Sequence, residues 1–86
     1  MLAKLVEVVN TKIEEEKLLV IGVDWGGSHE TNAVIPDRID TDENGIHIEG
    51  ENLMLDIASE NAYNVSFNEN EEEFVITQGQ VTFYLS

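Results

Sequence analysis

The chain has 86 residues, of which 42% are hydrophobic and none is cysteine. This length and apolar content predict one folded domain over residues 1–86 and exclude a disordered chain. The lack of cysteine excludes disulfides and thiolate metal sites. Eighteen acidic residues against four basic ones give a formal net charge of −14. A surface of this sign repels nucleic acid and anionic membranes and attracts basic proteins, so we expect no direct nucleic-acid partner and no membrane partner.

The N-terminal residues lack the long apolar segment of a signal peptide. The longest apolar run, residues 18–23, is as long as a strand and far shorter than a membrane span. We therefore expect a cytoplasmic protein.

The first element is predicted to be an amphipathic helix over residues 2–13. Its apolar residues recur with the spacing of one helical stripe, at Leu2, Leu5, Val6, Val9 and Ile13. Three glutamates follow at 14–16, where carboxylates oppose the helix dipole. Their presence at this end indicates that the charge serves something other than stability.

The rest of the chain has the patterns of β-strands. An apolar run over 18–24 ends in a Trp-Gly-Gly-Ser turn, and residues 29–35 are interpreted as a return strand that Pro36 interrupts. Alternating segments then follow at 38–42, 45–49, 53–57, 64–68, 74–77 and 81–85. The predicted fold class is α+β, with one N-terminal amphipathic helix packed on an antiparallel sheet of five or six strands. The other sheet face is left to solvent or to a partner.

Acidic residues dominate the second half of the chain. After Arg38 there is no lysine or arginine, whereas eleven acidic residues follow, so this half is expected to lack counter-charge. Many of the acidic residues alternate with apolar ones, which predicts that they share the outward side of the hairpins, about 6.6 Å apart along each strand. The predicted partner-binding surface consists of Asp40, Asp42, Glu43, Glu49, Glu51, Asp56, Glu69, Glu71, Glu72 and Glu73.

One segment matches a metal-binding pattern. Residues 40–51 fit the calcium loop D-x-[DN]-x-[DN]-G-x5-E, with oxygen ligands at Asp40, Asp42, Asn44 and Glu51. However, no helix is predicted before this segment. Residues 46–48 alternate like a strand, directly after the Asn44-Gly45 signal of a hairpin turn. An acidic hairpin is the favoured interpretation, and no metal or other cofactor is predicted.

Other residue types of functional interest are few. Asp24, Ser28 and His29 have the chemistry of a hydrolase triad, but their closeness in sequence is explained by loop composition, and no catalytic residue is predicted. His29 and His47 are interpreted as exposed histidines rather than as metal ligands or a pH switch. Trp25, beside two glycines, is a candidate aromatic anchor for a partner, with capping of the core as the alternative.

In size, charge and α+β pattern the chain resembles small phage-encoded DNA-mimic inhibitors, which include the uracil-DNA glycosylase inhibitor, several anti-CRISPR proteins and inhibitors of histone-like proteins. The resemblance is one of class, so no family site is transferred. It implies a non-enzymatic inhibitor that occupies the basic nucleic-acid-binding surface of a host protein in the bacterial cytoplasm. The sequence leaves open an immunity protein or antitoxin that neutralises a basic toxin, a calcium-binding module over residues 40–51, and a viral assembly subunit. A homodimer is compatible with each.

Overall fold

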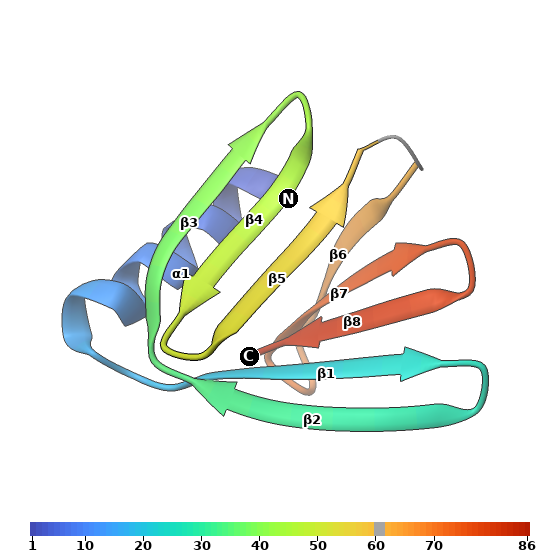
Figure 1. The fold of residues 1–86 in the computed structure, drawn as a ribbon, viewed down its shortest axis with the longest axis horizontal. Helices are drawn as coiled ribbons and strands as arrows, with labels where there is room; N and C mark the ends of the chain where they lie inside the picture. The colour runs from blue at the N-terminus through green and yellow to red at the C-terminus, as the bar shows by residue number, and fades with distance from the viewer. Residues whose placement is uncertain (60–61) are drawn as a thin grey trace.

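A computed structural model of the chain describes residues 1–59 and 62–86 (Figure 1). One helix, α1 (Leu2–Glu15), precedes eight strands in this part of the chain. The strands are β1 (Leu19–Trp25), β2 (Ser28–Val34), β3 (Pro36–Asp42), β4 (Gly45–Gly50), β5 (Leu53–Ala58), β6 (Asn64–Asn68), β7 (Glu73–Gln78) and β8 (Val81–Leu85).

The strands form two antiparallel sheets. Five strands lie in the order β2-β1-β8-β7-β6, and three lie in the order β3-β4-β5. The predicted fold class is confirmed, although the strands number eight in the described residues and are divided between two sheets. The division falls where β2 ends at Val34 and β3 begins at Pro36. Proline has no N–H to donate, so the ladder of the first sheet cannot continue through it.

The predicted helix is confirmed and extends two residues beyond its expected end. Its stripe buries Leu5 and Val9 completely, and the helix lies against β3. The last turn closes through Glu16, a left-handed residue with φ of 53°, and the Lys17 N–H donates to the Lys12 carbonyl at 2.9 Å. Within the described residues, no helix combines the length and apolar character that a membrane span needs.

Both sheets turn one face toward a common core and leave the other face to solvent. The three-stranded sheet contributes Ile46, Ile48 and Ile57, and the five-stranded sheet contributes residues such as Ile76 and Leu85. Each of these side chains is at most 1% exposed. Because side chains alternate along a strand, the residues between them point away from the core. The structure therefore presents two outer faces with different side chains.

A glycine fixes the turn between β3 and β4. Gly45 has φ of 130°, and a Cβ at this position would overlap the Ile57 carbonyl oxygen and lie 3.0 Å from the Ser59 nitrogen. The Asn44 N–H also donates to Asp42 Oδ1 at 2.7 Å. The hairpin predicted from the Asn44-Gly45 signal is confirmed, and its glycine allows β5 to approach the turn closely.

Candidate functional site

Acidic side chains gather on the outer face of the three-stranded sheet. Opposite Asp40 on β3 lies His47 on β4, and opposite His47 lies Asp56 on β5. A second row runs through Arg38, Glu49 and Met54. The outward residues of this sheet, here named the acidic face, are Arg38, Asp40, Asp42, His47, Glu49, Met54 and Asp56.

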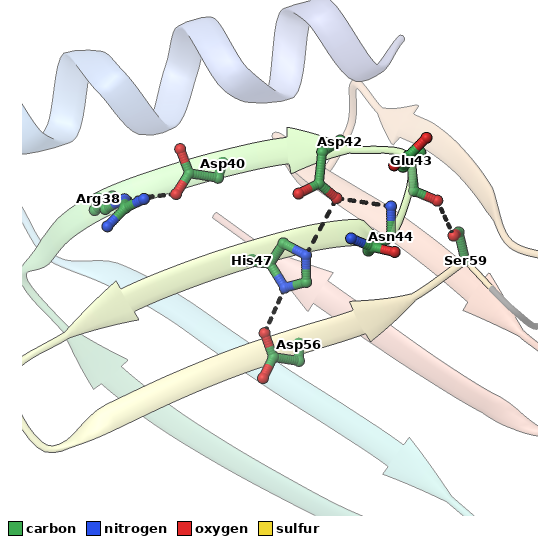
Figure 2. A network of polar contacts seen from close by, with 8 residues as sticks. All are labelled: Arg38, Asp40, Asp42, Glu43, Asn44, His47, Asp56 and Ser59. Carbon is green, nitrogen blue, oxygen red and sulfur yellow. Dashed lines mark hydrogen bonds and ion pairs between the residues drawn. The ribbon is translucent and has the colours of Figure 1, made fainter.

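His47 occupies the middle of the acidic face and lies between two carboxylates (Figure 2). Its Nδ1 is 2.6 Å from Asp56 Oδ1, and its Nε2 is 3.5 Å from Asp42 Oδ1. The hydrogen bond to Asp56 has the largest effect and raises the pKa of His47 above its ordinary value. Desolvation lowers this pKa, whereas the hydrogen bond and charge of Asp42 and the charge of Asp56 raise it. Only the imidazolium can donate from both ring nitrogens, so the two carboxylates favour the protonated form.

An ion pair between Arg38 and Asp40 lies at the edge of the acidic face, beside the two contacts of His47. Arg38 Nε is 2.5 Å from Asp40 Oδ2, and both side chains are exposed (Figure 2). The acidic face thus holds four carboxylates and one guanidinium, for a charge of −3 when His47 is neutral and −2 when it is protonated. The net charge of the acidic face therefore changes as His47 titrates.

The β3–β4 turn is held against the end of β5 next to this network. The Ser59 hydroxyl donates to the Glu43 carbonyl, and the Ser59 N–H donates to the Asn44 carbonyl at 2.9 Å. Asn44, His47, Asp56, Ala58 and Ser59 line a shallow hollow of about 500 Å³ beside the turn. The backbone around the hollow is fixed by these bonds, so the flanking carboxylates have a defined spacing.

The first and last residues of the calcium pattern are not brought together. Asp40 lies opposite His47, and Glu51 follows His47 four residues further along. At about 3.3 Å per residue, this places the two positions about 13 Å apart along the strand, whereas calcium ligands lie within about 2.6 Å of the ion. Among the described residues, no group of three or more histidine and acidic side chains is arranged to hold a metal ion.

The predicted acidic surface is divided between several places. Glu43 lies in the β3–β4 turn and Glu51 in the β4–β5 turn, at opposite ends of the three-stranded sheet. The acidic run at 69–72 forms the β6–β7 turn, and Glu73 begins β7, so this run belongs to the other sheet. Glu69, Glu71, Glu72 and Glu73 therefore lie outside the acidic face and do not extend its carboxylate array.

Two lysines lie near that second acidic group. Lys4, Lys12, Glu69 and Glu72 line one groove of about 470 Å³ between α1 and the five-stranded sheet, and Lys4 Nζ lies 4.0 Å above the centre of the Phe67 ring. The second half of the chain has no lysine or arginine after Arg38, but two lysines of α1 line the same groove as its carboxylates. In the sequence, this arrangement is indicated only by the spacing of Lys4 and Lys12, because residues eight apart lie on the same side of a helix.

The hydrolase-like residues and Trp25 lie on the five-stranded sheet. Asp24 lies directly opposite His29, whose Nε2 is 3.1 Å from the Thr31 hydroxyl, whereas Ser28 pairs with Trp25 on the alternate face. The three triad residue types are thus not assembled. Trp25 is 66% exposed at the end of β1 and lines a small hollow with Val23, Ser28 and Glu30. It does not cap the core, so its side chain is accessible to a partner.

No protein-family model, curated protein or solved structure matches the chain. The acidic face is the largest grouping of interacting charged side chains in the described residues. Function is therefore inferred from its geometry.

Proposed function

We propose that the protein is a non-enzymatic inhibitor whose acidic face occupies the basic nucleic-acid-binding surface of another protein. One observation carries this proposal: four carboxylates occupy outward positions of a three-stranded sheet whose inward residues include the buried Ile46, Ile48, Leu55 and Ile57. The carboxylates are thus fixed on a rigid backbone. A rigid charge array loses little conformational freedom when it binds.

The spacing of this array suits lysine and arginine side chains. Asp40 and Asp42 are alternate residues of β3, about 6.6 Å apart, and Asp56 is two strand spacings or roughly 10 Å from β3. A basic groove that binds DNA meets about one phosphate per 3.4 Å of each strand. Long basic side chains can follow such spacings, and the release of counterions favours their contact with carboxylates as it does with phosphates.

The ion pairs within the acidic face do not prevent its carboxylates from contacting basic side chains of a partner. The Arg38 and Asp40 side chains are 64% and 47% exposed, and an ion pair of this kind contributes about 0–1 kcal/mol. A partner's arginine can therefore replace Arg38 at small cost. His47 is different, because its protonation reduces the charge that a basic partner meets, so binding should strengthen as the pH rises through its pKa.

The test is affinity capture from a bacterial lysate at low and high salt with three forms of the chain. One variant replaces Asp40, Asp42 and Asp56 with asparagine. The matched control replaces Glu14, Glu15 and Glu16 with glutamine, which removes the same charge at the C-terminal end of α1, from residues that do not belong to the acidic face. We expect the natural chain and the control to retain nucleic-acid-binding proteins at low salt, and the face variant to lose them.

Competition with DNA then checks the kind of surface that is occupied. A captured protein should be released by duplex DNA, and its own DNA binding should be inhibited by the natural chain. Recovery of no DNA- or RNA-binding protein at low salt would refute the proposal. Equal loss by both variants would also refute it, because net charge rather than the acidic face would then be responsible.

A further inference from the structure

Strand β2 is an open edge of the five-stranded sheet. It has seven residues and pairs with β1 on one side, and within the described residues no strand pairs with its other side. Residues 28–33 are all exposed, and Figure 1 shows β2 as the outermost strand of its sheet. Half of its backbone N–H and C=O groups therefore point away from the sheet and can pair with a further strand.

Both edges of the three-stranded sheet are protected. The helix lies against β3, which also contains Pro36 and a register shift before Arg38. At β5, Asp56 places a charge on the edge, and the Gln78 amide donates to the Ala58 carbonyl at 2.5 Å. Strand β6, the other edge of the five-stranded sheet, also lacks charge and proline, but it has five residues against seven in β2 and so offers fewer backbone groups. Short length, charge, proline, bulges and covering elements are the usual means of preventing edge pairing.

The composition of β2 shows almost none of these means. Its sequence, Ser-His-Glu-Thr-Asn-Ala-Val, has no proline, lysine, arginine or glycine, and Glu30 is its one carboxylate. The chain as a whole has 18 acidic residues in 86. A docking strand for a basic partner would be expected to carry several carboxylates, as β3 does. A nearly neutral edge in a protein of charge −14 instead suits a partner of the same charge, which is another copy of the chain.

We propose that β2 pairs with β2 of a second copy, antiparallel about a two-fold axis at Thr31, so that two five-stranded sheets join into one sheet of ten strands. In this register Thr31 faces Thr31 of the second copy, Glu30 faces its Asn32, and His29 faces its Ala33. All seven residues of the strand are paired. A two-fold interface of this kind is self-complementary and closed, which limits assembly to a dimer.

Charge and length select this register over its neighbours. Moving the axis to Glu30 sets the two Glu30 carboxylates directly opposite each other, which is unfavourable. Moving it to Asn32 leaves Ser28 and His29 outside the pairing, so five residues rather than seven are paired. Registers between these are excluded, because directly opposed side chains must lie on the same face of an antiparallel pair.

This dimer is independent of the proposed inhibitor function, since β2 and the acidic face belong to different sheets. The two associations also respond to salt in opposite directions. Salt screens the repulsion between two chains of charge −14 and so strengthens the dimer, whereas it weakens the attraction between the acidic face and a basic partner. Failure of one proposal therefore leaves the other standing.

Cysteine cross-linking tests the axis directly, because the natural chain has no cysteine. Directly opposed residues of an antiparallel pair have Cα atoms about 4.5–5.5 Å apart, within the range of a disulfide. The variant Thr31→Cys should form a covalent dimer under mild oxidation. The controls Ala33→Cys, displaced from the axis, and Ser66→Cys, on the β6 edge, should cross-link several-fold less.

Light scattering on the unmodified chain supplies the second measurement. Asn32→Glu places two pairs of carboxylates opposite each other at the interface and should weaken the dimer about tenfold, whereas Asn64→Glu, an exposed change on β6, should not. Retention of the far-UV circular dichroism spectrum shows that each variant is folded. The proposal is wrong if the natural chain stays monomeric at high salt and millimolar concentration, or if the Thr31→Cys variant cross-links no better than the Ser66→Cys variant.

Discussion

Replacing Gly45 with alanine should lower the free energy of unfolding by about 3–5 kcal/mol. A non-glycine residue at φ of 130° costs about 1–3 kcal/mol of backbone strain. The new Cβ also overlaps the Ile57 carbonyl, and β5 must move away from the turn. That movement breaks the two hydrogen bonds from Ser59 to the turn, at about 1 kcal/mol each.

Urea unfolding followed by far-UV circular dichroism measures this loss. For a chain of this size, a loss of about 3 kcal/mol lowers the melting temperature by roughly 12 °C or more. Gly79→Ala is the matched control, because Gly79 also has positive φ, at 61°, but has no neighbour within 4 Å of an added Cβ. The control should lose about 1–2 kcal/mol. Equal losses in the two variants would refute the close approach of β5 to the turn.

Three further outcomes are expected. An NMR titration of His47 should give a pKa above about 6.5, and Asp56→Asn should lower it; an unchanged His47 titration would contradict the hydrogen bond. The stabilisation from a raised pKa is complete below the pKa of the unfolded chain and is lost as the pH rises through the pKa of the folded chain. Asp56→Asn should therefore destabilise the protein more at about pH 5.5 than at about pH 8.5. Lys4→Met should cost about 0.5–1 kcal/mol through its loss from the Phe67 ring, more than Lys17→Met, whose exposed pair with Glu15 is 3.5 Å long. Calorimetry at millimolar calcium should show no binding heat, and a saturable heat would contradict the separation of Asp40 and Glu51.

Strand positions and their inward residues can be predicted because they depend on local pattern. Ile46 and Ile48 alternate with polar residues and are buried, as the period of a half-buried strand requires. The division of the strands into two sheets cannot be predicted from local pattern. It depends on β1 pairing with β8 across most of the chain, and no local pattern records that pairing.

The same limit explains what sequence reasoning misses at the candidate site. From its sequence, His47 is expected to be merely exposed, because its neighbours in the chain, Ile46 and Ile48, cannot bond to its ring. Its partners, Asp42 and Asp56, come from the strands on either side, and their approach depends on the register of β3 and β5 against β4. Likewise, the contact between the Lys4 ammonium and the Phe67 ring joins α1 to β6, which are far apart in the chain.

The three strands of the acidic face are continuous in sequence, whereas the sheet below them is not. Residues 36–58 form β3, β4 and β5 without interruption, and the five-stranded sheet is built from the segments on either side. That sheet is closed by β1 against β8 and by the two hydrogen bonds between Val20 and Ser86. The acidic face is thus formed by a single continuous segment of the chain. Its outward residues can be replaced as a set without altering the segments that build the five-stranded sheet, provided that the inward isoleucines and Gly45 are kept.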